Sequence, residues 1–267
     1  MKSNLQSKKL FLLDMDGTIY LDHEIFPETI PFLNALKEKG ARHLYLTNNS
    51  SKSVSAYVEK LSSLGITATK DEFLTSTDAT ILFLEKHYKK EDKIYAFGTA
   101  SFREQLAEAG FRIVTTPDED VKLLLMGFDT ELCFSKLEDA CILLGRGVDY
   151  VATNPDLVCP TWYGFVPDCG SIANILETAT GRRPRFIGKP HPEMILLAIE
   201  KAGVEKEDAV MIGDRLYTDI AAGVNAGIDT IFVLSGEGTL EDEKKSEKKP
   251  TYIMKNVGEV MNAFLGK

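Results

Sequence analysis

Short apolar runs alternate with amphipathic helical patterns along most of the chain. Residues 9–14 (KLFLLD) and 42–49 (RHLYLTNN) are rich in apolar side chains and predict buried strands. Residues 27–40 and 53–65 place apolar side chains at every third or fourth position and end in glycine, which predicts a helix after each strand. This order of strand, helix, strand and helix is typical of a parallel sheet covered by helices.

The same alternation continues toward the carboxyl end. Further strands are predicted at 93–98, 121–129, 149–155, 184–190, 208–214, 229–234 and 251–254, and helices at 101–110, 135–147, 192–203 and 217–227. The charged stretch 241–249 (EDEKKSEKK) has no apolar face and is expected to be a solvated loop. We therefore expect an α/β protein throughout.

Composition and charge exclude several classes of function. The 267 residues include 31 basic and 40 acidic side chains, and the net charge of -9 argues against binding to a nucleic acid polymer or an anionic membrane. No apolar run approaches the roughly 20 residues that span a bilayer. The chain shows no signal-peptide cleavage pattern, and its 4 cysteines have no CxxC spacing. We expect a cytoplasmic protein with reduced thiols.

Four of the predicted strands end in polar clusters. The clusters are Asp14-Met15-Asp16-Gly17-Thr18, Thr47-Asn48-Asn49-Ser50, Gly188-Lys189-Pro190 and Gly213-Asp214-Arg215. In a parallel α/β sheet, ligands bind beyond the carboxyl ends of the strands. Asp14 and Asp16, one residue apart, repel each other unless a cation or a shared proton offsets the repulsion. We therefore expect the clusters to form one ligand site.

Together the clusters offer the parts of a phosphoryl site. Asp14, Asp214 and a backbone carbonyl would form a hard, all-oxygen pocket of the kind that suits Mg2+. Lys189 adds a compact positive charge, and Thr47 and the amides around residues 48 and 49 add hydrogen-bond donors. One aspartate of the first cluster can attack phosphorus and become an aspartyl phosphate. The other can protonate the leaving oxygen and later activate water.

These motifs resemble those of the haloacid dehalogenase-like phosphatases. Asp14-x-Asp16-Gly17-Thr18 is similar to the first family motif, Thr47 to the second, Lys189 to the third, and Gly213-Asp214 with Asp219 to the fourth. The resemblance implies a Rossmann-like parallel-sheet core and the hydrolysis of phosphate esters. Family members that split carbon–halogen bonds or pump ions generally lack a carboxylate at the position of Asp16.

The resemblance also implies a role for each of these residues. Asp14 would be the nucleophile and Asp16 the general acid and base. Mg2+ would bind to Asp14, to the backbone oxygen of Asp16 and to Asp214, while Asp219 would orient Lys189 or metal-bound water. The residues expected to bind the phosphate ester are Thr47, Asn48, Asn49, Lys189 and, from the inserted region, Asn154.

The long segment between Thr47 and Lys189 predicts a second domain. It holds about 140 residues, far more than a simple crossover between parallel strands uses. We expect a catalytic core at 1–77 and 186–267 and an inserted α/β cap domain at 78–185. The segments TNNS, ATNPD, GSIANILETATG and GKPHPE are similar to those of the NagD-like subgroup. That similarity implies small phosphate monoesters as substrates, such as nucleotide monophosphates, sugar phosphates and nitrophenyl phosphate.

In that subgroup, loops of the cap contact the leaving group, and caps often mediate dimers. Here the candidate contacts are Asn154, Asp156 and the loop at 159–170, and the resemblance allows a homodimer. Cys159 stands where pyridoxal-phosphate phosphatases of the subgroup carry a histidine, which argues against that substrate.

Two alternatives stay open. A phosphotransferase or mutase would use the same phosphoaspartate chemistry with a sugar hydroxyl as the acceptor. A receiver-like signalling module would also place acidic residues, a threonine and a lysine around Mg2+, but such modules are shorter and lack a large inserted domain. Transfer of labelled phosphate to an added acceptor, or a stable phospho-Asp14 without turnover, would identify one or the other.

Overall fold

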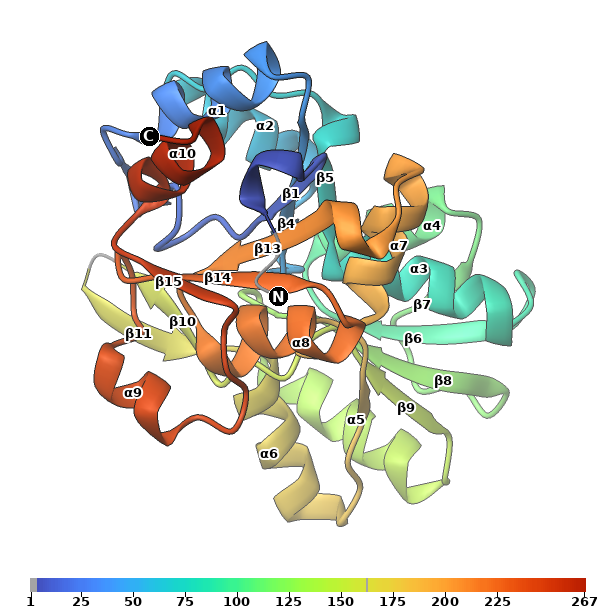
Figure 1. Ribbon diagram of the computed structural model, residues 1–267. Helices are drawn as coiled ribbons and strands as arrows, with labels where there is room; N and C mark the ends of the chain where they lie inside the picture. Colours follow the sequence, from blue (N-terminus) through green and yellow to red (C-terminus); the bar gives the residue numbers. More distant parts are fainter. Residues whose placement is uncertain (1–3, 162) are drawn as a thin grey trace. The chain divides into compact units, whose positions relative to one another are not determined.

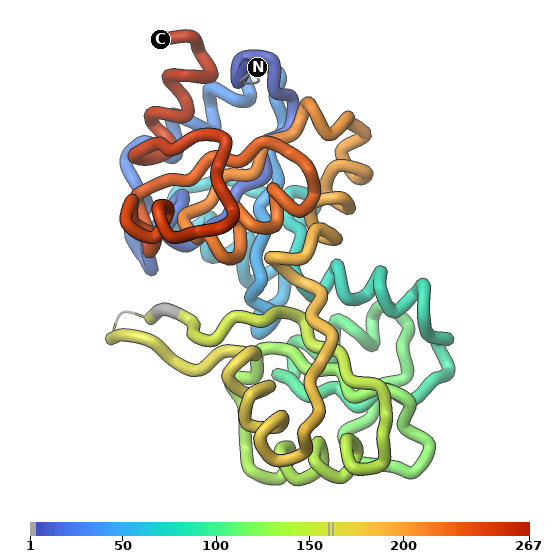
Figure 2. Tube along the Cα trace, turned by 60° about the horizontal axis from the view of Figure 1, so that its bottom comes forward, coloured from blue at the N-terminus to red at the C-terminus, as the bar shows by residue number. Residues whose placement is uncertain are grey.

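The computed structural model describes residues 4–161 and 163–267. The chain divides into two compact units. Unit 1 consists of Met1–Thr47, Val58–Leu74 and Lys189–Lys267, and unit 2 of Asn48–Tyr57 and Thr75–Gly188. Figure 2 shows this division along the chain, because the blue and orange-to-red segments make up most of unit 1 and the green and yellow segments most of unit 2.

Unit 1 is built on one large sheet. Among the described residues this sheet has six strands, in the order β15-β14-β13-β1-β4-β5. Their bounds are β1 (Leu10–Leu13), β4 (Arg42–Thr47), β5 (Phe73–Thr75), β13 (Ala209–Gly213), β14 (Asp229–Val233) and β15 (Tyr252–Met254). The central strand β1 pairs in parallel with both β13 and β4, and its four residues are fully buried. Burial on both faces explains why β1 is apolar at every position instead of alternating.

Helices cover the sheet of unit 1. They are α1 (Thr29–Glu38), α7 (Glu193–Ala202), α8 (Ala221–Ala226), α9 (Leu240–Lys245) and α10 (Val257–Leu265), and α2 (Val54–Ser63) begins in unit 2 and ends in unit 1. Helices α1 and α10 lie side by side (Figure 1) and pack on β1 through edge-on contacts of Phe11 with Phe32 and Phe264. Helix α7 packs against β1 and α8. Shorter elements are the 3-10 turns η1 (Leu5–Ser7), η2 (Lys70–Glu72) and η3 (Lys206–Asp208), the π-helical turn η4 (Leu216–Ile220), and a hairpin of β2 (Tyr20–Leu21) and β3 (Glu24–Ile25).

The charged stretch at 241–249 is only in part the loop that its composition predicts, because no helix or strand includes residues 246–249 but a helix precedes them. Residues Leu240–Lys245 form α9, which opens with a capping box between Thr239 and Asp242. The Asp242 amide donates to Thr239 Oγ1 at 3.2 Å, and the Thr239 amide donates to Asp242 Oδ2 at 3.0 Å. Acidic residues occupy the first turn and lysines the last, which complements the helix dipole. Capping and charge order thus support a short helix that has no buried residue.

Unit 2 is a second parallel α/β unit with its own core. Its five-stranded sheet has the order β12-β9-β8-β6-β7, and a separate antiparallel hairpin joins β10 and β11. The strands are β6 (Lys93–Phe97), β7 (Arg112–Val114), β8 (Val121–Met126), β9 (Asp149–Ala152), β10 (Val158–Thr161), β11 (Gly164–Pro167) and β12 (Arg185–Phe186), and the helices are α3 (Ser76–His87), α4 (Ala100–Glu108), α5 (Phe134–Gly145) and α6 (Cys169–Thr180). Helices α5 and α6 bury their apolar faces in a core with β8 and β9. The prediction of an α/β fold with a parallel-sheet core is confirmed.

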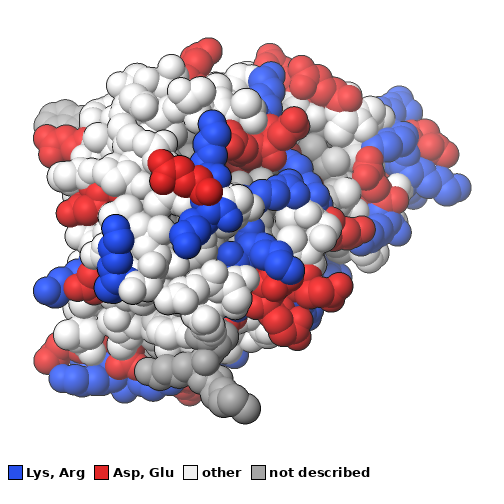
Figure 3. All heavy atoms as spheres, turned by 45° about the horizontal axis from the view of Figure 1, so that its top comes forward, with Lys and Arg blue, Asp and Glu red and all other residues white. Residues whose placement is uncertain are grey.

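The described helices and one face of the surface show how apolar and charged side chains are distributed. In the part of the chain that the structure describes, no helix combines the length and the apolar character that crossing a bilayer requires. On the face seen in Figure 3, lysine and arginine side chains are interspersed with aspartate and glutamate. On this face, opposite charges therefore lie next to each other and do not form a patch of one sign.

Candidate active site

The carboxyl ends of β1, β4 and β13 lie next to one another because these strands are neighbours in a parallel sheet. The Asp14 amide donates to the Ile212 carbonyl at 2.9 Å, which continues the pairing of β1 with β13 by one residue. Asp14 therefore leaves β1 beside the end of β13, where Asp214 follows Gly213. Strand β1 also has β4 on one side and β13 on the other, so its end is the kind of switch point at which open α/β sheets bind ligands.

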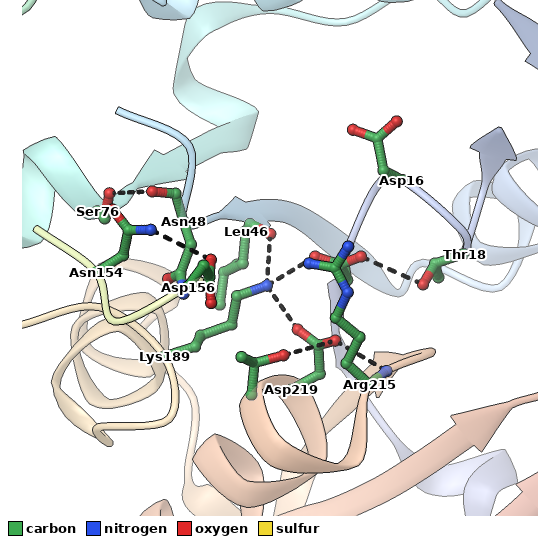
Figure 4. Close-up of polar contacts among 12 residues, drawn as sticks. Asp16, Thr18, Leu46, Asn48, Ser76, Asn154, Asp156, Lys189, Arg215 and Asp219 are labelled. Atoms are coloured by element: carbon green, nitrogen blue, oxygen red, sulfur yellow. Dashed lines mark hydrogen bonds and ion pairs between the residues drawn. The ribbon is translucent and has the colours of Figure 1, made fainter. Parts of the chain in front are cut away.

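Lys189 joins the ends of these strands. Its Nζ lies 2.7 Å from Asp14 Oδ1 and 2.6 Å from Asp219 Oδ1, and it donates to the Leu46 carbonyl at 3.2 Å (Figure 4). An ammonium group has three donors, so these contacts use all of them. Burial alone would lower the pKa of Lys189, but Asp14 and Asp219 raise it above its ordinary value, and the side chain stays charged.

Asp14, Asp214 and Asp219 form a cluster in which one carboxylate oxygen of each lies within 4.8 Å of the others. Asp219 reaches this cluster from η4, where the Ile220 amide donates to the Arg215 carbonyl at 3.2 Å, the wide turn of a π-helix. Gly213 leaves room for it, because a Cβ at that position would lie closer than 3.0 Å to the Asp219 side chain. The second oxygen of Asp219 accepts from the Arg215 amide at 3.2 Å.

The charges in this cluster do not balance. Burial and then the charge of Asp219 raise the pKa of Asp14, and Lys189 only partly opposes them. Burial and Asp219 likewise raise the pKa of Asp214 to about 6. Besides Lys189, the cation that acts on these carboxylates is Arg215, which also pairs with Glu237 at 2.8 Å. Four carboxylates against two cations leave an excess of negative charge, which a divalent cation would offset.

Asp214 supplies the observation that tests whether a cation fits. It is buried, and among the described residues its Oδ1 has no hydrogen-bond partner. A buried carboxylate oxygen without a partner is costly unless a ligand completes it. Because the available donors are all hard oxygens, the residues present fit Mg2+.

Asp16 lies apart from this cluster. Its side chain is 43% exposed, and in Figure 4 its carboxylate points away from Lys189. Tyr20 donates to Asp16 Oδ2 at 3.3 Å, and Lys60 Nζ lies 3.6 Å from Asp16 Oδ1. Tyr20 comes from β2 and Lys60 from α2, and an exposed carboxylate held in this way can meet a substrate or water.

The other predicted phosphate-binding residues are divided between the units. Thr47 is buried at the end of β4 in unit 1. The Asn48 amide group donates to Asp156 Oδ2 at 3.1 Å, and Asn49 Oδ1 accepts from Ser51 N at 2.9 Å, both within unit 2. The side chains of Asn48 and Asn49 are thus engaged in their own unit.

Asn154 and Asp156 form a buried polar network with Asp168 in unit 2. Asn154 Nδ2 lies 3.1 Å from Asp168 Oδ1 and 3.3 Å from Asp156 Oδ2 (Figure 4 shows the contact between Asn154 and Asp156). The Cys169 amide also donates to Asp168 Oδ1 at 2.5 Å. The loop predicted at 159–170 contains the β10–β11 hairpin and the start of α6, and its residue 162 lies outside the described residues.

Two residues near Asp214 were not predicted from the sequence. Glu237 donates its backbone amide to Asp214 Oδ2 at 2.7 Å, and a Cβ on Gly236 would lie closer than 3.0 Å to the same oxygen. Both residues follow β14, and the only hint in the sequence is the glycine-rich stretch Ser235-Gly236-Glu237-Gly238 after a predicted strand.

Comparisons with known proteins identify the family. A model described as haloacid dehalogenase-like hydrolase matches residues 11–112, and one described as HAD-hydrolase-like matches residues 186–260. The acid sugar phosphatase of Staphylococcus aureus is 35% identical over 257 residues, which cover 96% of this chain and 98% of that protein. The resemblance predicted from the strand-end motifs is therefore confirmed.

Solved structures agree over nearly the full length. The 4-nitrophenylphosphatase from Thermotoga maritima superposes with a TM-score of 0.91 at 42% identity, covering 97% of this chain and 98% of that chain. The glycerol phosphate phosphatase from Mycobacterium tuberculosis, in complex with magnesium, has a TM-score of 0.90 at 30% identity and covers 98% of this chain and 79% of that chain. The chain therefore belongs to the haloacid dehalogenase-like hydrolases, in the group of NagD and 4-nitrophenylphosphatase, and is a phosphoric monoester hydrolase.

Proposed function

We propose that the chain hydrolyses small phosphate monoesters in a Mg2+-dependent reaction that passes through a phosphorylated Asp14. The observation that carries this proposal is the difference among the clustered carboxylates. The Asp14 side chain is 15% exposed, whereas that of Asp219 is 1% exposed. Asp214 is buried as well. Asp14 is therefore the member of the cluster that a substrate can reach.

In the first step, a carboxylate oxygen of Asp14 forms a bond to phosphorus while the bond from phosphorus to the ester oxygen breaks. Asp16 gives its proton to that ester oxygen, so the leaving group departs as an alcohol. In the second step, Asp16 takes a proton from water, and the water oxygen bonds to phosphorus. The bond to Asp14 breaks, and inorganic phosphate is released.

Other residues hold the transferring group. Lys189, whose three donors already have partners, would hold its oxygens through its positive charge. Thr47 and the backbone amides of residues 48 and 49 would donate hydrogen bonds to them. Asp219 would orient Lys189, a role supported by the 2.6 Å contact between them. Asp14, Asp214 and the backbone oxygen of Asp16 would hold Mg2+, which when bound offsets the clustered negative charge and stabilises charge on the phosphoryl oxygens.

The proposed substrates are nucleotide monophosphates, sugar phosphates and nitrophenyl phosphate. The names of the relatives, an acid sugar phosphatase and a 4-nitrophenylphosphatase, support the last two classes. We further propose that residues 78–185 act as a cap that selects the leaving group, with Asn154 contributing to substrate binding. The cytoplasmic location and the homodimer stay predictions.

A phosphate-release assay tests this proposal. The wild-type chain is freed of metal with EDTA and assayed on 4-nitrophenyl phosphate, nucleotide monophosphates and sugar phosphates, before and after Mg2+ is added. We expect phosphate release only with Mg2+. Release that is indifferent to chelation would remove the metal from the scheme, and phosphate that passes to an added sugar instead of water would favour the phosphotransferase.

A further inference from the structure

The loop Ser235–Gly238, which follows β14, wraps around Asp214. The Glu237 amide donates to Asp214 Oδ2 at 2.7 Å, and the Gly238 amide donates to the Asp214 backbone oxygen at 3.1 Å. One loop therefore satisfies two of the three oxygens of this residue. The third, Oδ1, is buried and has no hydrogen-bond partner among the described residues.

Two glycines make this approach possible. A Cβ on either Gly17 or Gly236 would lie closer than 3.0 Å to Asp214 Oδ2. Gly17 has a left-handed φ of 84°, which also favours glycine. Gly236 has no left-handed φ, so lack of space, and not backbone conformation, accounts for glycine there. An added methyl group at Gly236 would therefore press on the Asp214 carboxylate itself.

The loop is anchored at both of its ends. Ser235 Oγ donates to the Gly17 carbonyl at 2.8 Å. The Glu237 carboxylate accepts from Arg215 Nε at 2.8 Å and from the Tyr217 hydroxyl at 2.9 Å. Gly17 belongs to the turn after β1, and Arg215 and Tyr217 follow β13. The loop thus ties the turn that carries Asp14 to the segment that carries Asp214.

We propose that the loop Ser235–Gly238 positions Asp214 to bind the metal through one oxygen, Oδ1, by occupying Oδ2 and the backbone oxygen. This inference rests on the proposed function, because it needs a cation beside Asp14. Mg2+ requires near-octahedral geometry and takes few protein carboxylates. A carboxylate whose other oxygen is fixed in place meets that requirement better than one that can rotate. Groups that hold a metal-binding residue in this way commonly change metal affinity when they are altered.

Gly236→Ala tests the crowded side of Asp214. Isothermal titration with MgCl2, on the full chain freed of metal, should show a Kd raised about tenfold or more. Gly145→Ala is the matched control, because Gly145 has an ordinary φ and nothing lies within 4 Å of its Cβ position. Its Kd should stay within about twofold of the wild-type value. A Gly236→Ala chain that binds Mg2+ as tightly as this control would overturn the proposal.

Ser235→Ala provides a second test in case Gly236→Ala does not fold, since it removes one anchoring hydrogen bond without adding atoms. We expect the Mg2+ Kd to rise about fivefold, the size of one neutral hydrogen bond. Ser235→Thr keeps the hydroxyl and should restore the wild-type Kd. Thermal unfolding of Ser235→Ala in EDTA separates metal binding from stability. If the loop only stabilises the fold, the variant will have a lower Tm but an unchanged Mg2+ Kd, and this result would contradict the proposal.

The same titrations separate the two levels of inference. A wild-type chain that binds no Mg2+ would contradict both the metal-dependent function and the role of the loop. A wild-type chain that binds Mg2+, with Gly236→Ala and Ser235→Ala unaffected, would contradict the role of the loop alone.

Discussion

Lys189 Nζ lies 2.7 Å from Asp14 Oδ1, although 175 residues separate the two in the sequence. This contact holds the proposed nucleophile at the carboxyl end of β1 and places a fixed positive charge beside the oxygen that would attack phosphorus. A second oxygen of the cluster, Asp219 Oδ1, holds Lys189 from the other side at 2.6 Å. The proposed catalytic roles depend on this arrangement, and each can be tested separately.

Asp14→Asn is expected to abolish turnover of 4-nitrophenyl phosphate. An amide keeps the shape of the side chain but is a poor nucleophile, so no aspartyl phosphate can form. Steady-state release of nitrophenolate measures the effect, and circular dichroism checks that the variant is folded. Turnover close to the wild-type rate would remove Asp14 from the role of nucleophile.

Asp16→Ala is expected to lower kcat by about 10²-fold or more, the usual size of general acid and base catalysis. Substrate binding should change little, because the Asp16 side chain is exposed and separate from the contacts of Lys189. Competition by inorganic phosphate against substrate measures the binding. A variant that binds poorly but keeps its kcat would show that Asp16 holds the substrate instead of moving protons.

Lys189→Met is expected to destabilise the chain by about 3–5 kcal/mol in EDTA, because it leaves buried carboxylates without their partner. The added change Asp219→Asn should recover part of this loss, since it removes one of the unpaired charges. Urea unfolding gives both values. Lys9→Met serves as the control, because Lys9 forms an exposed ion pair with Asp208 at 2.8 Å, and such pairs contribute about 1 kcal/mol or less. Equal losses for Lys189→Met and Lys9→Met would be inconsistent with the buried cluster.

His43 is expected to make stability depend on pH. Burial lowers its pKa below the ordinary 6.5, and the nearby Glu72, whose Oε1 lies 3.6 Å from Nε2, only partly opposes this. As pH falls through 6.5, the unfolded chain therefore binds the proton more readily than the folded chain, and stability is lost. The loss continues until the lowered folded-state pKa is reached, at no more than about 1.4 kcal/mol per pH unit for one proton.

Urea unfolding of His43→Gln between pH 7.5 and pH 5 checks this expectation. The variant should lose less stability over this range than the wild type does. His23→Gln is the matched control, because it removes an imidazole at an exposed position. An identical pH dependence for His43→Gln and the wild type would show that His43 does not contribute.

The sequence predicted the fold class because its strands are buried on both faces. Strand β1 is apolar at each position and ends at Asp14, so both the strand and its polar end can be recognised without a structure. Helix α9 was missed because periodicity detects only helices with a buried face, and the capping box of Thr239 and Asp242 does not depend on burial. The sequence pattern also predicted no element for α3, at Ser76–His87. The signal that could have indicated this helix is the capping box of Thr75 and Asp78.

The part of the candidate site that could be predicted from the sequence consists of polar side chains that directly follow a strand. Asp14 and Asp214 follow β1 and β13, neighbours in one sheet, as predicted. Lys189 does not end a strand of that sheet, because the strand before it, β12 (Arg185–Phe186), belongs to the sheet of unit 2, but its side chain still lies against Asp14. The contact of Glu237 with Asp214 could not be predicted, because the donor is a backbone amide and any residue type except proline could supply it. Its only requirement on the sequence is the small neighbour Gly236, and a glycine after a strand usually indicates a turn.

The central claim is that Asp14 carries the phosphoryl group during turnover. Asp16→Ala should slow the attack of water and let the intermediate accumulate, so this variant is mixed with 4-nitrophenyl phosphate and Mg2+, quenched in acid and digested for mass spectrometry. We predict a phosphoryl group on the peptide that contains Asp14, lost on treatment with hydroxylamine and absent when Asp14→Asn is added. Continued turnover by Asp16→Ala with no phosphoryl group on Asp14, or with one on another residue, would contradict the account.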